Sequence, residues 1–229
     1  MEQRVGVIIV AGGSGRRMGS TLPKQFAFVG GEPILVRTIN TFARALPGAK
    51  IVVVLPADQR DYWRNLAARF RVARHTVTIG GAERFHSVKN GIEALTEHYD
   101  IIAIQDGVRP LCSEQMIRRV AECAVEHGAA IPVVVPVDSF RITTDDDSQI
   151  IDRATLRSVQ TPQIFAADIL RAAYDVEYDA SFTDDASVVE QAGFKVALCE
   201  GERTNIKLTT PEDIYIAEAI LEARRDAED

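Results

Sequence analysis

The chain has 229 residues, of which 46% are hydrophobic and 26% charged, and its formal net charge is −7. That length suits one α/β domain with its own core. The negative charge argues against binding nucleic acid, since phosphate backbones are bound by basic surfaces, and no apolar stretch approaches the ~20 residues that cross a bilayer. Any polyanionic ligand must therefore meet a local cluster of positive charge.

The first ten residues and the pattern of cysteines indicate the cellular compartment of the protein. The opening MEQRVGVIIV has a single arginine and no small-residue cleavage site, so it does not resemble a signal peptide. The three cysteines, Cys112, Cys123 and Cys199, are odd in number and scattered, which favours reduced thiols over a disulfide framework or a zinc site. We therefore expect a cytoplasmic protein.

Apolar runs alternate with amphipathic segments over the first 135 residues. This alternation predicts an α/β fold whose mostly parallel sheet is covered by helices on both faces. The expected strands are Val5–Val10, Ile51–Leu55, Thr76–Ile79, Ile101–Ile104 and Ala130–Val135, and the expected helices are Ile34–Leu46, Asp58–Phe70, Glu83–His98 and Ser113–His127.

Three loops follow strands of this sheet. In open α/β sheets, ligands bind at the carboxyl ends of the strands. We expect that edge to carry Ala11–Gln25, Gly80–Ser87 and Gln105–Pro110. The functional site should therefore form where these loops meet.

The pattern changes after Pro136. Residues Ser139–Thr161 alternate with period two around the turn-prone TTDDDSQ, which predicts a β-hairpin. An isolated hairpin is marginal in water, so an arm at about residues 137–160 should pack against another body, such as a second subunit. Asp145–Asp147 are interpreted as a solvated turn.

The rest of the chain returns to α/β patterning within the same single domain, 1–229. Helices are expected near Ala167–Tyr174 and Asp184–Gln191, with a strand at Lys195–Leu198. TTPEDI opens a last helix, Pro211–Arg224, with a capping threonine, a first-turn proline and acidic residues that favour the helix dipole.

The glycine-rich loop VAGGSGRRMGSTLPKQ raises the question of which phosphate it holds. A dinucleotide fingerprint would need glycine where Met18 stands, and no Walker string is present. Glycines that open the backbone, together with Arg16, Arg17 and Lys24, suit a highly charged triphosphate. The alternative is a glycine-rich turn whose arginines face solvent.

Six strings carry a resemblance to a known family. They are VAGGSGRRMGSTLPKQF, GGAERFHSV, DGVRP, DRATLRSVQTPQIF, TDDASVVE and NIKLTTPED, in this order and over nearly the whole chain. Together they resemble the nucleotidyltransferases that join CTP to a sugar-alcohol phosphate, most closely those acting on 2-C-methyl-D-erythritol 4-phosphate. The resemblance implies a Rossmann-like three-layer nucleotidyltransferase fold with a projecting β-hairpin arm.

The resemblance also implies a reaction. CMP would pass from CTP to 2-C-methyl-D-erythritol 4-phosphate, giving 4-diphosphocytidyl-2-C-methyl-D-erythritol and pyrophosphate in the non-mevalonate isoprenoid pathway. The acceptor phosphate is already an anion, so no general base is required and catalysis reduces to alignment and charge stabilisation. Three alternatives remain: a ribitol 5-phosphate cytidylyltransferase, a non-catalytic nucleotide sensor, and an NAD-dependent dehydrogenase, which Met18 disfavours.

The family pattern assigns catalytic roles by position. Arg17 and Lys24 would stabilise the pentavalent transition state, and Lys207 would reach the α-phosphate. Asp106 would hold Mg²⁺ or another divalent cation against the triphosphate. The alternatives without a catalytic role are a turn residue for Asp106 and ordinary exposed lysines for Lys24 and Lys207.

Binding residues are implied in the same way. CTP would contact main chain and small side chains, because a base read by backbone needs close approach, and the acceptor phosphate would meet Arg153 from a partner's arm in a homodimer. The nucleotide set is Val10, Ala11, Gly12, Gly13, Gly15, Gly81, Ala82, Ser87, Asp106 and Gly107; the acceptor set is Arg109, Ser139, Arg153, Thr161, Thr183 and Lys207.

Three positions depart from the family pattern. Gln105 stands where relatives usually have histidine, and Ala82 where they often have aspartate. Ser139 lies in PVDSF, where relatives have one more residue. Of the residues assigned from the family pattern, Ser139 therefore matches its equivalent least closely. Ser87 also has a structural alternative, as a first-turn residue of a helix.

Overall fold

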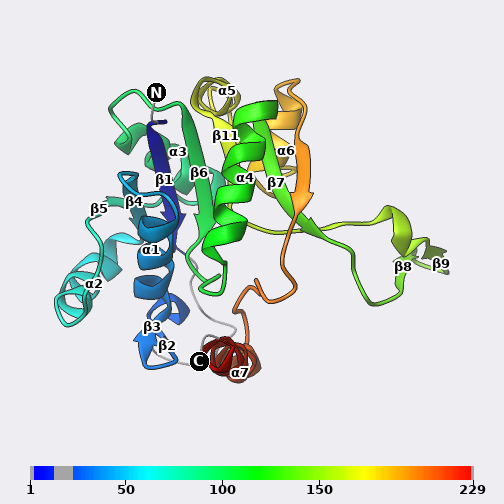
Figure 1. Cartoon of the computed structure of the whole chain (residues 1–229). Helices are drawn as coiled ribbons and strands as arrows, with labels where there is room; N and C mark the ends of the chain where they lie inside the picture. Colours follow the sequence, from blue (N-terminus) through cyan, green and yellow to red (C-terminus); the bar gives the residue numbers. More distant parts are fainter. Residues whose placement is uncertain (1–2, 13–22, 228–229) are drawn as a thin grey trace.

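A computed structural model of the chain describes residues 3–12 and 23–227. Its centre is an eight-stranded sheet with the order β10-β7-β11-β6-β1-β4-β5, and β12 pairs with β7 outside this path (Figure 1). β1 pairs in parallel with β4 and β6, and β4 with β5, whereas β11 runs antiparallel between β6 and β7. The predicted mostly parallel α/β sheet is therefore confirmed.

The central parallel strands β1, β4 and β6 are short, rich in β-branched residues and mostly buried. Val7, Ile8 and Ile9 of β1 are each fully buried, because both faces of the sheet are covered. The strands of the main sheet are β1 Val5–Val10, β4 Lys50–Leu55, β5 Thr76–Ile79, β6 Ile101–Asp106, β7 Ala129–Val134, β10 Ser158–Val159, β11 Gln163–Ala166 and β12 Ala197–Glu200.

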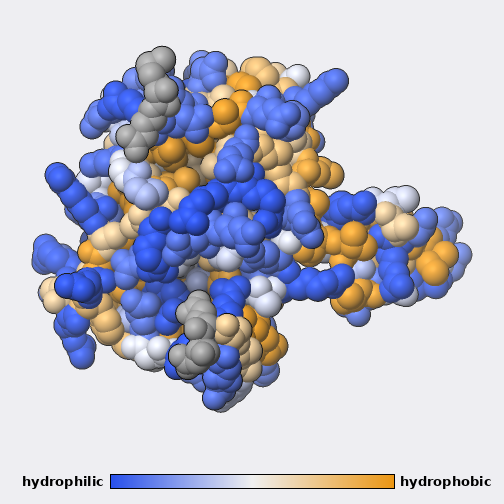
Figure 2. Space-filling model, viewed as in Figure 1, coloured by the Kyte–Doolittle hydropathy of each residue, from blue (hydrophilic) through white to orange (hydrophobic). Residues whose placement is uncertain are grey.

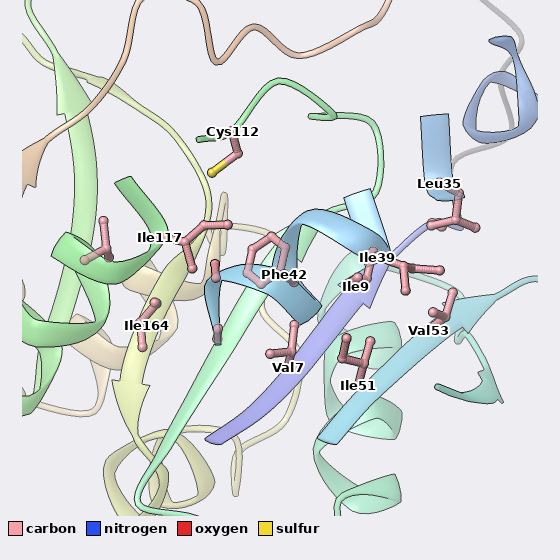
Figure 3. Close-up of a cluster of buried hydrophobic side chains, with 14 of the residues drawn as sticks. Val7, Ile9, Leu35, Ile39, Phe42, Ile51, Val53, Cys112, Ile117 and Ile164 are labelled. Atoms are coloured by element: carbon pink, nitrogen blue, oxygen red, sulfur yellow. The ribbon is translucent and has the colours of Figure 1, made fainter. Parts of the chain in front are cut away.

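Two layers of helices cover the two faces of the sheet. Because successive side chains of a strand point to opposite faces, Val7 and Ile9 belong to one hydrophobic cluster and Ile8 to the other. The first cluster, drawn in Figure 3, includes α1 (Ile34–Ala45), α2 (Arg60–Ala67) and α4 (Glu114–His127). The second includes α3 (Arg84–Ala94), α5 (Ala167–Ala173) and α6 (Asp185–Gln191).

The last helix forms a smaller body below this sandwich. α7 (Pro211–Asp226) buries Ala217 and Leu221 in a cluster with Val29 and Leu208. Val29 comes from a two-stranded ribbon, β2 (Phe28–Val29) and β3 (Glu32–Pro33). The predicted capping of this helix is confirmed: the Thr210 and Asp213 side chains complete a capping box.

Several predicted elements differ in extent. α3 ends at Ala94, four residues before the predicted His98, and the predicted helix 58–70 is a 3₁₀ turn (Ala57–Gln59) followed by α2, which ends at 67. β12 lies two residues later than predicted. β11 was not predicted, because its four residues, QIFA, directly follow Pro162 and show no period-two alternation.

A β-hairpin projects from the body, as Figure 1 shows. It consists of β8 (Phe140–Thr143) and β9 (Ser148–Ile151), which pair antiparallel across the predicted turn. The hairpin is shorter than predicted, because β10 pairs with β7 and so belongs to the main sheet. Among the described residues, no helix is long and apolar enough to cross a membrane.

Candidate active site

A cavity of about 220 Å³ opens at the carboxyl ends of β1 and β6. This edge is where we expected the three loops to meet, and residues of all three contribute to it. We call this cavity the cleft; its described lining is Val10, Ala11, Gly12, Lys24, Gln25, Gly81, Ala82, Glu83, Arg84, Ser87, Asp106, Val108 and Lys207.

Asp106 is the charged centre of the cleft. Its Oδ2 lies 2.8 Å from Lys207 Nζ and 3.7 Å from Arg109 Nε, and its Oδ1 lies 3.6 Å from Arg84 Nε. One buried carboxylate thus faces three cations from distant segments of the chain. The imbalance leaves positive charge available for an anionic ligand.

The pKa of Asp106 follows from this arrangement. Burial by itself raises the pKa of a carboxyl group, but the nearby charges of Arg84 and Lys207 outweigh it, so the pKa of Asp106 lies below its usual value. The group is therefore ionised at neutral pH. It can hold Lys207 or contribute an oxygen to a bound cation.

The backbone around Asp106 is fixed by three hydrogen bonds. The Asp106 N–H donates to Thr161 Oγ1 at 3.1 Å, and the Gly107 N–H donates to the Val10 carbonyl at 2.8 Å. A Cβ on Gly107 would lie 2.9 Å from the Ala11 Cβ, so only glycine lets the two loops approach this closely. The Gln105 amide, which replaces the usual histidine, is buried and donates to the Arg109 carbonyl at 3.1 Å.

Arg84 is a cleft residue that the sequence analysis did not select. Its guanidinium forms two hydrogen bonds to Asp185, of 2.8 and 2.7 Å, and Asp185 is fully buried. Asp185 also accepts a 2.7 Å hydrogen bond from the Tyr174 hydroxyl. Burial would lower the pKa of Arg84, but Asp185 and Asp106 raise it above its ordinary value. The one available signal was that Arg84 lies in GGAERFHSV and Asp185 in TDDASVVE.

The edge of the cleft opposite Asp106 consists of backbone and small side chains. The Gly81 N–H donates to Ser87 Oγ at 3.1 Å, and Ser87 is buried in the first turn of α3. A Cβ on Gly81 would lie 2.3 Å from the His86 Cβ. Together with Val10, Ala11 and Gly12, this edge offers main-chain groups to a planar ligand.

Lys24 enters the cleft from a short 3₁₀ helix, Lys24–Phe26. The helix is anchored by Phe26, which is fully buried, and by Gln25, whose Nε2 donates to Gln59 Oε1 at 2.5 Å. Pro23 precedes it with an extended backbone. Lys24 therefore projects from an anchored turn.

Lys207 and Arg109 are held by the segment after β12. The Arg109 Nη1 donates to the Asn205 carbonyl at 2.8 Å, and the Leu208 N–H donates to the Val108 carbonyl at 2.9 Å. The Lys207 side chain remains 44% exposed. It can therefore leave Asp106 for a ligand phosphate without disturbing the fold.

Other predicted site residues lie elsewhere. Ser139 and Arg153 are exposed on the arm, and the Arg153 guanidinium donates to the Val137 carbonyl of the same arm. Thr183 is exposed just before α6, and Thr161 is buried beneath Asp106. The predicted Gly13, Gly15 and Arg17 lie outside the described residues.

A three-layer α/β sandwich whose strand ends gather cations around one carboxylate defines a nucleotide-binding protein of the nucleotidyltransferase class. The family model of 2-C-methyl-D-erythritol 4-phosphate cytidylyltransferase matches residues 5–223. The chain belongs to this family, so the predicted family and the predicted cytidylyltransferase activity are confirmed.

Relatives and solved structures agree over nearly the full length. A 2-C-methyl-D-erythritol 4-phosphate cytidylyltransferase of Bacteroides thetaiotaomicron is 48% identical over 216 residues, covering 94% of this chain and 98% of that protein. One from Geobacillus kaustophilus is 42% identical, with 95% and 96% covered. The crystal structure of 4-diphosphocytidyl-2C-methyl-D-erythritol synthase from Anaerococcus prevotii has a TM-score of 0.82 at 28% identity, with 97% and 100% covered.

Proposed function

We propose that the chain transfers the cytidylyl group of CTP to the phosphate of 2-C-methyl-D-erythritol 4-phosphate at the cleft, in the non-mevalonate isoprenoid pathway. Family membership over residues 5–223 supports the reaction. We place the reaction at the cleft because Lys207, Arg84 and Arg109 cluster around Asp106 there. These cations would attract the phosphate groups of the substrates to this end of the sheet.

The chemistry needs alignment rather than proton transfer. An oxygen of the acceptor phosphate attacks the α-phosphorus of CTP, a new P–O bond forms, and the bond to the β-phosphate breaks to release pyrophosphate. The attacking phosphate is already anionic, so its oxygen needs no base. Lys207 would move from Asp106 to the α-phosphate, while Lys24 and Arg17 would offset the charge that develops on the leaving pyrophosphate.

The cytosine and ribose would occupy the backbone edge of the cleft. Gly81, Ala82 and Ser87 offer main-chain groups and one hydroxyl to the pyrimidine, opposite Val10–Gly12. Because main-chain groups would recognise the base, Ala82 can stand where relatives often have aspartate. Gly13, Gly15 and Gly107 complete the proposed nucleotide contacts.

A divalent cation, Mg²⁺ above all, would be held by Asp106 and the triphosphate. Mg²⁺ is commonly bound through one or two carboxylates plus substrate phosphates. The buried, ionised carboxylate of Asp106 fits this mode, and among residues 3–12 and 23–227 there is no cluster of three or more ligating side chains. When bound, the cation would neutralise phosphate charge.

The acceptor would bind between the cleft of one protomer and the arm of its partner. Arg109, Thr161 and Lys207 surround Asp106, Thr183 lies just before α6, and Arg153 and Ser139 lie on the arm. Arginine can bind a phosphate through two hydrogen bonds. The exposed apolar side chains of the arm, such as Ile142 and Ile150, support a homodimer in which the arm packs against a second copy of the chain.

A panel of nucleotides crossed with acceptors tests this function. Pyrophosphate release is measured with CTP, UTP, ATP and GTP, each with 2-C-methyl-D-erythritol 4-phosphate or ribitol 5-phosphate and Mg²⁺. We expect turnover only with CTP and the methylerythritol acceptor. Preference for ribitol 5-phosphate would replace the proposed acceptor, and tight CTP binding without release would indicate a sensor.

A further inference from the structure

A second hollow, of about 660 Å³, lies between α1, α4 and α7. It shares no lining residue with the cleft, although both border the turn after β6: Val108 lines the cleft, whereas Pro110 and Cys112 line the hollow. In Figure 1, α1 and α4 lie over one face of the sheet and α7 lies below them. We call it the arginine hollow, after Arg37, Arg44, Arg224 and Arg225 in its lining.

The lining of the arginine hollow has a surplus of positive charge. Four arginines face only two carboxylates, Glu114 and Glu202. Glu114 is shared, because it accepts a hydrogen bond from Arg44 Nε at 2.8 Å and another from Arg118 Nη2 at 2.7 Å. Arg37 also pairs with Glu32 at 3.5 Å and Arg224 with Glu202 at 4.0 Å, so five arginines share three carboxylates in a molecule whose net charge is −7. Figure 2 shows a hydrophilic surface over this face of the molecule.

Arg37 and Arg225 are the clearest instance of this excess. Their Nη2 atoms each lie 3.3 Å from the same point, the position that a Cβ on Gly30 would take. The Arg225 side chain forms no hydrogen bond or ion pair with any described residue, and Arg37 Nε is buried without a hydrogen-bond partner among them. Two guanidinium groups that approach the same backbone position repel one another, and an anion within reach of both would offset that repulsion.

The electrostatics of Arg37 agree with this geometry. Burial lowers the pKa of Arg37, Glu32 at 3.5 Å raises it, and the three other arginines of the hollow lower it further. The net effect is a pKa below the ordinary value. An anion bound in the hollow would relieve both the desolvation and the repulsion.

We propose that the arginine hollow is a second binding site, for the phosphate or diphosphate group of a small phosphorylated molecule. The surplus of two charges matches a phosphate dianion, and guanidinium groups bind phosphate oxygens through paired hydrogen bonds. Thr41, Ser113 and Thr204 add hydroxyl groups to the lining. The volume leaves room for an organic part beside the phosphate.

Calorimetry with a filled cleft tests the proposal. The protein is saturated with CTP in the absence of metal and acceptor, and then titrated with inorganic diphosphate. We expect one diphosphate bound per chain in the wild-type protein. A parallel titration with glycerol 3-phosphate distinguishes a site for inorganic anions from one that accepts phosphate esters.

Arg225→Ala is the informative variant, because Arg225 supports no described hydrogen bond. We expect its diphosphate affinity to fall about 10–100-fold, the loss of one charge-assisted contact. Arg64→Ala is the matched control, since Arg64 is an exposed arginine on α2 outside the hollow. It should bind diphosphate as the wild-type protein does.

Two results would overturn the site: no diphosphate bound to the CTP-loaded wild-type protein, or the same affinity in Arg225→Ala. Melting temperatures of the unliganded proteins serve as a folding check, and Arg225→Ala should melt no lower than the wild type because it relieves repulsion. The rate of cytidylyl transfer is a separate readout, so failure of this site and failure of the proposed function are distinguishable.

Discussion

The cleft and the arm differ in how completely one chain builds them. The cleft gathers Lys24, Arg84, Asp106 and Lys207 from four distant segments, and ion pairs join Arg84 and Lys207 to Asp106. The arm is one local hairpin whose apolar residues remain exposed: Ile142 at 55% and Ile150 at 73%.

The register of the hairpin explains why the arm needs a partner. Phe140 and Ile142 lie on one face, and Ile150, opposite Arg141, lies on the other. A two-stranded ribbon cannot bury either face against itself. The difference between the regions therefore supports the proposal that one chain supplies the nucleotide side of the site and that a second copy completes the acceptor side.

The largest expected effect is on turnover when a cleft lysine is lost. Lys24→Ala or Lys207→Ala should lower kcat about 10²–10³-fold, as the loss of one well-placed charge-stabilising group does elsewhere. Pyrophosphate release with CTP, acceptor and Mg²⁺ measures it. Lys195→Ala, an exposed lysine on the far part of the fold, should keep the wild-type rate. Near-normal turnover in both cleft variants would remove their assigned roles.

Stability should respond most strongly at Arg84. Arg84→Ala leaves the fully buried Asp185 with the Tyr174 hydroxyl as its remaining side-chain partner, so the free energy of unfolding should fall by about 3–5 kcal/mol. Asp185→Asn should cost less, because Arg84 is partly exposed and still faces Asp106. Urea unfolding measures both. Equal losses of unfolding free energy in the two variants would contradict the interpretation that buried Asp185 depends on Arg84 more than Arg84 depends on Asp185.

Assembly should respond to a charge on the arm while the fold does not. Ile150→Asp places a carboxylate on an exposed apolar position, so a dimer formed through the arm should dissociate in sedimentation velocity. The free energy of unfolding of the monomer should change by no more than about 0.5 kcal/mol. CTP affinity should persist and acceptor turnover should fall. Gln149→Asp, an exposed polar position on the same hairpin, is the control; dissociation of both variants, or of neither, would argue against an apolar arm interface.

The smallest effect concerns acid stability. The pKa of Asp106 is lower in the folded protein than in the unfolded chain, so its ionised form contributes stability above the unfolded value, and this contribution is lost as pH falls through the folded value. The difference in free energy of unfolding between the wild type and Asp106→Asn should therefore be largest near pH 7. It should shrink below about pH 4. A difference independent of pH would contradict the ion cluster.

Local pattern carried much of the fold and the position of the cleft. The apolar runs of the sequence predicted β1, β4, β5 and β6. The tendency of ligands to bind at the carboxyl ends of parallel strands predicted which loops meet. The sequence could not reveal β11, because an antiparallel strand inserted between β6 and β7 depends on a long-range pairing with no local signature.

Site residues that belong to a family motif could be predicted from the sequence. Residues that reach the site only through tertiary packing could not. Asp106, Lys24 and Lys207 were selected through the resemblance, and the fold brings all three to the cleft. Arg84 was missed, because its partner Asp185 lies 101 residues away and only the packing of α3 against α6 joins them. Thr161 was assigned to the acceptor, and its hydroxyl also supports the Asp106 backbone.

Mixing two inactive variants tests the shared site most directly. Lys207→Ala disables a cleft, and Arg153→Ala disables an arm, so each variant alone should be inactive. In a mixed dimer, the cleft with Lys207 receives the arm with Arg153. Random reassociation should then restore about a quarter of the wild-type rate, since half of the dimers are mixed and each has one intact site. A mixture as inactive as its components would show that the arm does not complete the neighbouring site.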